Sequence, residues 1–227
     1  MTIHDETTVS TLGDSAARVR VEGTMAVNND VNNEAQIRRW LQVAATWRFL
    51  SLLFQSPTPQ SYSELQALIS ELPSEQQERA RQLMTMPLEG WQAEFHRVLG
   101  PGGVPACESS YEENALAGRG PVIADIAGFY RAFAYSPANA PAETPDHMSI
   151  ELGFLSYLAL KIAFATYAGK HEEAQLACDA YRRFLTDHLH YWAEPFQQAV
   201  ARAASPLYST GAEWVCALEQ SATCGTG

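Results

Sequence analysis

An imidazole and a carboxylate at helical spacing are the first residues here that could do chemistry. His147 and Glu151 lie four residues apart, which places both side chains on one face of a helix. With a third group such as Asp146 nearby, the pair could ligate a metal ion or transfer protons. One hypothesis is therefore a metal-dependent enzyme or metal-binding protein that uses His147 and Glu151. The simpler alternative is a surface pair or a structural hydrogen bond.

Other reactive residue types lack the surroundings that catalysis needs. Ser109 and Ser110 follow Glu108, but no nucleophile elbow frames them, and Ser110 with Glu113 fits a helix cap. A thiol nucleophile at Cys107 stays open, although burial is the commoner fate of one cysteine. The glycines at 100–103 lack the lysine of a phosphate loop. The leading interpretation therefore has no catalytic residue, no metal ligand and no cofactor.

The elements that must position these residues are all helices. Prolines and capping signatures divide the chain: Ser61 with Glu64 and Ser74 with Gln77 are two capping boxes, and Thr144 precedes Pro145 as a third cap. No segment alternates like a strand. The expected helices span residues 34–55, 61–72, 74–86, 87–99, a short helix from 110, 122–134, 146–167, 172–193 and 206–220. The sequence predicts an all-α, bundle-like single domain of about eight to ten helices.

The ends of the chain and one linker differ from the helical body. Residues 1–33 are expected to be a disordered leader, residues 34–220 the helical domain and residues 221–227 a frayed tail. The Pro/Ala-rich stretch 136–145 is a possible internal boundary, across which a swapped dimer is an alternative to the expected monomer. The apolar run 152–168 reads as a buried core helix, and no membrane anchor is expected.

Composition narrows the class of partner. Apolar residues make up 46% and charged residues 18% of the chain, which excludes a disordered protein. With 26 acidic and 15 basic residues the net charge is −11, so a nucleic-acid partner is disfavoured and a basic peptide suits better. The four cysteines form no Cys-x-x-Cys pair and are expected to be reduced thiols of a cytoplasmic protein.

Several short motifs occur together in an order typical of one family. They are residues 94–100 (EFHRVLG), 105–112 (PACESSYE), 129–130 (FY), 145–155 (PDHMSIELGFL) and 184–192 (FLTDHLHYW). On these motifs, residues 36–200 resemble the TorD/DmsD/NarJ family of redox-enzyme maturation chaperones. The 145–155 segment is the most specific of the set.

The resemblance implies a non-enzymatic, cytoplasmic, all-helical chaperone. Such a protein binds the twin-arginine leader, the apo form, or both, of a molybdopterin-containing oxidoreductase catalytic subunit. It holds that client until the cofactor is inserted and prevents premature export. A structural subunit that stays in the mature oxidoreductase complex is a further alternative.

A twin-arginine leader offers two arginines beside an apolar stretch, so its receptor needs carboxylates beside an apolar groove. We expect Glu108, Asp146 and Glu151 as arginine acceptors, with His147 beside them in the motif. The candidate groove walls are Trp91, Tyr111, Tyr130 and Phe154. The alternative is that the carboxylates are structural or solvated and that all four aromatic rings belong to the core.

Overall fold

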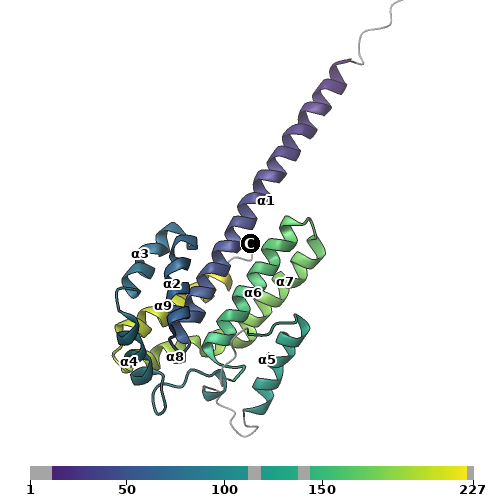
Figure 1. The fold of residues 1–227 in the computed structure, drawn as a ribbon. Helices are drawn as coiled ribbons and strands as arrows, with labels where there is room; N and C mark the ends of the chain where they lie inside the picture. The colour runs from purple at the N-terminus through teal and green to yellow at the C-terminus, as the bar shows by residue number, and fades with distance from the viewer. Residues whose placement is uncertain (1–11, 112–118, 138–143, 224–227) are drawn as a thin grey trace, which may run out of the picture.

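The chain folds as an all-α domain, as predicted. The computed structural model describes residues 12–111, 119–137 and 144–223, and within them no strand forms (Figure 1). The helices are α1 (Leu12–Phe54), α2 (Pro59–Leu68), α3 (Ser74–Leu83), α4 (Leu88–Val98), α5 (Gly120–Ala132), α6 (Met148–Tyr167), α7 (His171–Phe184), α8 (His190–Arg202) and α9 (Pro206–Thr223). Two 3-10 turns, Ile69–Glu71 and Glu108–Ser110, and a π turn, Leu185–Leu189, complete the described elements.

Helix α6 is the centre of the core. It packs antiparallel to α1, where Ser51 Oγ donates to the Ser149 carbonyl over 2.7 Å and Ser156 Oγ donates to the Ala44 carbonyl over 2.8 Å. Among the described residues, α6 is the one helix long and apolar enough to cross a membrane, and 78% of its apolar window is buried. It is therefore the core helix that the apolar run 152–168 predicts.

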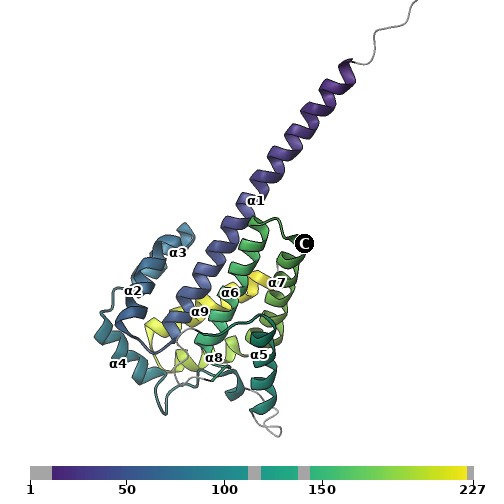
Figure 2. The ribbon, with the colours of Figure 1, turned by 45° about the vertical axis from the view of Figure 1, so that its right-hand side comes forward.

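Helix α1 begins earlier than expected. The sequence predicts a helix from residue 34 after a disordered leader, whereas α1 starts at Leu12 and its N-terminal half extends beyond the other helices (Figures 1 and 2). No proline interrupts residues 12–54, and each residue added to an already packed helix costs little free energy. Residues 12–33 are therefore helical here, while residues 1–11 and 224–227 lie outside the described part. The division into domains stays a prediction.

Two predicted helix starts are wrong. Helix α2 begins at Pro59, with Thr58 as N-cap: Thr58 Oγ1 accepts from the Ser61 amide and Ser61 Oγ accepts from the Thr58 amide. Ser61 thus closes a capping box instead of opening one. Helix α6 is capped by His147 rather than Thr144, because His147 is extended and forms an isolated antiparallel bridge with Cys107.

The predicted helix 172–193 is interrupted. A π turn, Leu185–Leu189, joins α7 to α8, and the chain continues as α8 through Pro195 to Arg202. Insertion of such a wide turn rotates the following residues about the helix axis and is common at functional sites. The predicted Ser110–Glu113 cap lies partly outside the described residues, as does most of the 136–145 linker.

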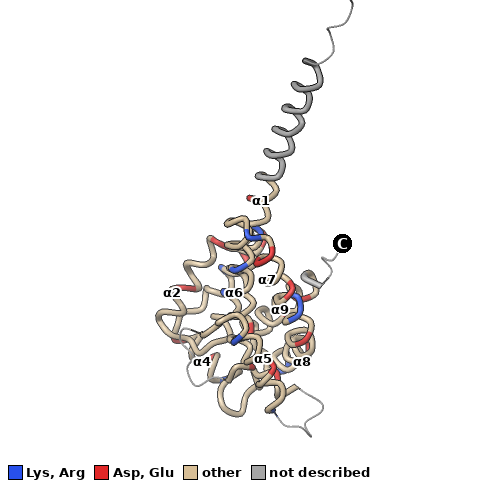
Figure 3. The backbone as a smooth tube through the Cα atoms, turned by 90° about the vertical axis from the view of Figure 1, so that its right-hand side faces the viewer, with Lys and Arg blue, Asp and Glu red and all other residues tan. Residues whose placement is uncertain are grey.

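Charged residues do not gather by sign. In Figure 3, acidic and basic positions are interspersed along the helical body. On α7, for example, Glu172, Glu173 and Asp179 precede Arg182 and Arg183. Where the net negative charge is concentrated therefore depends on the contacts of individual acidic side chains.

Candidate functional site

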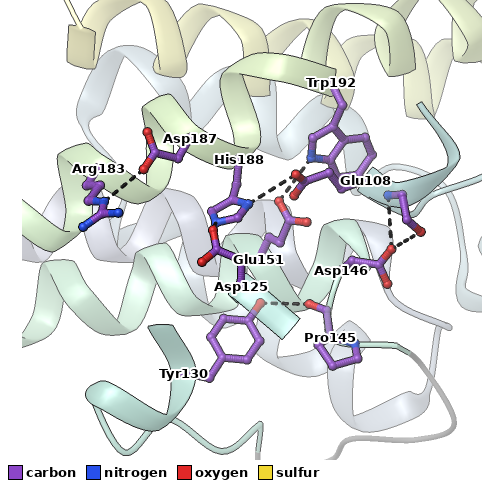
Figure 4. Close-up of polar contacts among 11 residues, drawn as sticks. Glu108, Asp125, Tyr130, Pro145, Asp146, Glu151, Arg183, Asp187, His188 and Trp192 are labelled. Carbon is purple, nitrogen blue, oxygen red and sulfur yellow. Dashed lines mark hydrogen bonds and ion pairs between the residues drawn. The ribbon is translucent and has the colours of Figure 1, made fainter. Parts of the chain in front are cut away.

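Three carboxylates from two distant segments meet inside the domain. Glu108 lies on a 3-10 turn, Asp146 precedes α6, and Glu151 lies on the first turn of α6 (Figure 4). Their exposed fractions are 5%, 1% and 0%. The structure thus brings the three predicted arginine acceptors together but buries them, so as direct contacts to a partner they stay a prediction.

A short backbone pairing holds the two segments side by side. The Glu108 amide donates to the Asp146 carbonyl over 2.9 Å, and the Met148 amide donates to the Ala106 carbonyl over 2.8 Å. This isolated antiparallel bridge, between Cys107 and His147, replaces the first turn that the Thr144 cap would have made. It places the Glu108 side chain next to that of Glu151.

The side chain of Asp146 fastens the same junction. Asp146 Oδ2 accepts from the Ser109 amide over 3.2 Å and from the Ser109 hydroxyl. Burial by itself would raise the pKa of Asp146, but the hydrogen bonds from Ser109 and Thr144 outweigh it and lower the pKa below its usual value. Asp146 is therefore a charged, structurally engaged carboxylate.

Glu151 is in the opposite electrostatic situation. It is fully buried, and its Oε2 accepts a hydrogen bond from the Trp192 indole over 3.2 Å. Burial and the nearby carboxylates of Glu108 and Asp146 raise its pKa well above the usual value. Glu151 therefore holds a proton, which it can donate to Glu108.

His188 connects this interior to the surface. Its Nδ1 lies 3.2 Å from Glu108 Oε1 and its Nε2 lies 3.5 Å from Asp125 Oδ2 on α5 (Figure 4). The imidazole is buried, whereas 65% of the Asp125 side chain is exposed. His188 and Asp125 are not among the expected site residues, because no motif or spacing pairs His188 with Glu108, 80 positions away, or with Asp125.

Every buried side-chain nitrogen or oxygen atom that lacks a hydrogen-bond partner in the described part of the chain belongs to this cluster. These atoms are Glu108 Oε2, Asp146 Oδ1, Glu151 Oε1 and His188 Nε2. Unpartnered buried polar atoms are rare and costly, and they mark places where a proton or a ligand completes the structure.

A small pocket opens above His188. It has a volume of about 340 Å³ and is lined by Glu108, Pro121, Val122, Asp125, Asp187, His188 and Tyr191. At its edge Asp187 accepts from Arg183 Nε over 3.0 Å. We refer to it as the acidic pocket.

The predicted groove-wall aromatics occupy different places. Trp91 is buried on α4 and donates to the Tyr208 hydroxyl over 2.9 Å, away from the carboxylates. Tyr130 and Phe154 pack against each other in the core, with ring centroids 4.8 Å apart, and the Tyr130 hydroxyl donates to the Pro145 carbonyl. Only Tyr111 is half-buried, stacked on Trp192 with ring centroids 5.6 Å apart.

The metal hypothesis finds little support in the geometry. His147 caps α6 and its Nδ1 accepts from the Ser149 amide, while Glu151 points to Trp192. Within the described residues no three His, Cys, Asp or Glu side chains are grouped so as to hold a metal ion. The described cysteines are thiols, with Cys107 Sγ 3.5 Å from Thr144 Oγ1.

A larger groove, of about 650 Å³, lies between α1, the start of α3, α7 and α9. Its apolar lining includes Trp40, Val43 and Tyr181, and the Trp40 and Tyr181 rings meet edge to face at 5.3 Å. This groove could accept apolar side chains, and none of the predicted site residues lines it.

Comparison with known proteins agrees with the motifs. A family model described as nitrate reductase delta subunit matches residues 54–198. The chlorate reductase assembly chaperone protein of Ideonella dechloratans is 31% identical over 112 residues, 48% of this chain and 57% of that protein. The selenate reductase assembly chaperone protein of Thauera selenatis is 31% identical over 125 residues, 54% of this chain and 64% of that protein. The match thus spans less than two thirds of either relative.

A solved structure has the same fold. The crystal structure of a protein described as a redox enzyme maturation protein from Archaeoglobus fulgidus superposes with a TM-score of 0.53 and 22% sequence identity. The superposition covers 78% of this chain and 93% of that chain.

Proposed function

Because the chain belongs to the nitrate reductase delta subunit family, which confirms its resemblance to the TorD/DmsD/NarJ chaperones, we propose that it is an assembly chaperone and not an enzyme. Its client is the catalytic subunit of a molybdopterin oxidoreductase of the kind that reduces oxyanions. The names of the two relatives, assembly chaperones of chlorate and selenate reductases, support this class of client. The chaperone holds the apo subunit in the cytoplasm until its cofactor is inserted.

The chaperone also binds the twin-arginine leader of that subunit. Two features favour such a ligand: an acidic pocket, and on the same domain a groove of about 650 Å³ whose mixed lining includes the apolar side chains of Trp40, Val43 and Tyr181. Carboxylates orient arginines through paired hydrogen bonds, and burial of the apolar stretch contributes most of the affinity. A monomer is sufficient for this, since both features lie within one chain.

The predicted site residues divide into two roles in this proposal. Glu108, at the floor of the acidic pocket, and Tyr111, which is half-buried, contact the peptide. Asp146, His147 and Glu151 hold Glu108 in place through the contacts described above. Trp91, Tyr130 and Phe154 support the binding surface from the core.

Titration of a synthetic leader tests the proposal. The peptide is the leader of the catalytic subunit encoded next to this gene, and the control peptide carries glutamine in place of both arginines. Tighter binding of the twin-arginine peptide, by isothermal titration calorimetry, is expected. Equal weak binding of both peptides would exclude leader recognition.

Two further measurements separate the alternatives. A stoichiometric metal that is lost in His147→Ala would favour a metalloprotein. Co-purification with the mature, exported oxidoreductase would favour a structural subunit, whereas co-purification with the apo subunit alone supports a chaperone.

A further inference from the structure

We propose that the acidic pocket is a binding site for one guanidinium group, with Asp125 and His188 as the residues that receive it. The source of that group, an arginine of the client's leader, rests on the proposed function above. The site shares Glu108 with the expected arginine acceptors, but Asp146 and Glu151 do not line it, and Asp125 of α5 and His188 of the π turn do.

The hydrogen-bond pattern at His188 calls for a donor in the pocket. When the imidazole is neutral and its Nδ1–H donates to Glu108 Oε1, the opposite nitrogen, Nε2, is an acceptor. It faces another acceptor, Asp125 Oδ2, at 3.5 Å, and it has no hydrogen-bond partner although His188 is only 3% exposed. A cation with several N–H groups that bound between these two atoms would satisfy both of them.

The charges around the pocket also require a cation. Three carboxylates line it, those of Glu108, Asp125 and Asp187. Arg183 pairs with Asp187 and is 71% exposed at the edge, and no lysine or arginine in the described part of the chain is ion-paired with Glu108 or Asp125. The pocket is therefore negative and its floor is shielded from water, which strengthens its attraction for a positive group.

The form of the pocket favours guanidinium over ammonium. Its volume of about 340 Å³ lies at the lower end of the range for ligand sites, enough for one long side chain. Pro121 and Val122 give it an apolar wall against which the methylene stem of an arginine can pack, and the half-exposed Tyr191 ring offers a face for a planar cation. A guanidinium can direct two parallel N–H groups of its planar fork at Nε2 and the Asp125 carboxylate, whereas the three N–H groups of an ammonium diverge from one atom.

A small probe tests the pocket without the client. L-argininamide is titrated into the full-length protein while the indole N–H signal of Trp192 is followed by NMR, because this group lies two hydrogen bonds from the pocket, through Glu151 and Glu108. A saturable shift is expected with L-argininamide and a weaker one with L-lysinamide. Equal shifts from the two amides, or none, would overturn the proposal.

Matched variants then test the site with the leader peptide. Asp125→Asn removes the exposed carboxylate of the pocket, and the control Asp179→Asn removes an equally exposed one from α7 outside it. We expect Asp125→Asn to weaken leader binding about ten-fold, the loss typical of one charge-assisted hydrogen bond, and the control to change it less than about two-fold. An equal loss of leader affinity in both variants would show that only the net charge of the protein matters, and it would overturn the proposed site.

A double-mutant cycle identifies the arginine and separates the two proposals. Two peptides, each with one arginine replaced by glutamine, are titrated against wild type and Asp125→Asn. For the peptide that lacks the bound arginine, the variant should bind as wild type does, whereas additive losses for both peptides would exclude the pocket. If wild type binds the twin-arginine and twin-glutamine leaders equally while L-argininamide still fills the pocket, the proposed function fails and the site stands.

Discussion

The indole N–H of Trp192 donates to Glu151 Oε2 over 3.2 Å and so connects α8 to α6 inside the domain. Neither residue is exposed. On its other side Glu151 faces Glu108, and the two carboxyl groups can share one proton. The interior of this domain therefore contains a carboxyl group whose pKa is raised well above its usual value by burial and by the neighbouring carboxylates.

Two replacements of Glu151 test whether its side chain stabilises the fold as a neutral hydrogen-bonding group. Glu151→Gln keeps both a donor toward Glu108 and an acceptor for Trp192, so we expect stability at pH 7 equal to or above that of wild type. Glu151→Ala leaves the indole and Glu108 unsatisfied and should lower the free energy of unfolding by about 1–3 kcal/mol. Urea unfolding monitored by circular dichroism measures both, and a glutamine variant as unstable as the alanine variant would contradict this account.

The same pair predicts a pH dependence. The pKa of Glu151 is raised in the folded protein, so its contribution to stability is complete below the unfolded pKa of about 4.3 and is lost as pH rises toward the folded pKa. Wild type should therefore lose stability relative to Glu151→Gln as the pH rises above the unfolded pKa of Glu151. A difference between the two proteins that does not change with pH would show that Glu151 is charged.

Asp146 should have the opposite pH dependence. Because hydrogen bonds lower its pKa in the folded protein, its stabilisation is present above the unfolded pKa of about 3.9 and is lost as pH falls through the folded value. Asp146→Asn should cost about 1–3 kcal/mol at pH 7 and less near pH 3. Urea unfolding at both pH values tests this, with the exposed Asp179→Asn as control; a cost that grows in acid would be inconsistent with a charged Asp146.

Trp91 is the predicted groove residue whose role is simplest to decide. Its indole donates to the buried Tyr208 hydroxyl over 2.9 Å, so Tyr208→Phe should cost about 1–3 kcal/mol through an unsatisfied N–H. Leader affinity, measured below the unfolding transition, should not change. Loss of affinity without loss of stability would instead place Trp91 in the binding surface.

Gly153 on α6 lies where neighbouring side chains leave little space for a Cβ atom. A Cβ there would lie 2.6 Å from the Tyr135 hydroxyl and 3.3 Å from Ser51 Oγ. Gly153→Ala should therefore destabilise by about 1–3 kcal/mol despite the better helix propensity of alanine. Adding Tyr135→Phe removes the closest atom and should recover much of the loss in thermal unfolding; no recovery would mean that the backbone contact of α1 with α6 sets the limit.

Much of the fold follows from local signals in the sequence. Proline and glycine positions, with the 3.6-residue spacing of apolar side chains, place both ends of α4, α5 and α9 and the start of α7 within a few residues of their observed positions. The start of α6 was misplaced because a contact with Cys107, distant in sequence, holds His147 in extended form. The early start of α1 is not predictable from apolar periodicity, because its first part is polar and therefore has no stripe of apolar residues at helical spacing.

The sequence was sufficient to predict which carboxylates belong to the candidate site, but not how they are arranged in three dimensions. The motifs marked Glu108, Asp146 and Glu151, and these three do meet. Their burial depends on α5 and on the π turn, whose partners lie tens of residues away along the chain. A pattern in one sequence contains residue types and spacings, but the pairing of Glu108 with His188 is set by tertiary packing.

One continuous helical segment borders both the larger groove and the acidic pocket. Cys178 and Tyr181 on α7 line the larger groove, and His188, in the π turn that continues α7, lines the acidic pocket. Seven residues separate Tyr181 from His188, or about 10 Å at the rise of an α-helix. For a peptide that occupied both cavities, this helix would fix the distance between a bound arginine and the apolar residues beside it. The protein would then select peptides by the number of residues between the arginine and the apolar stretch, whatever those intervening residues are.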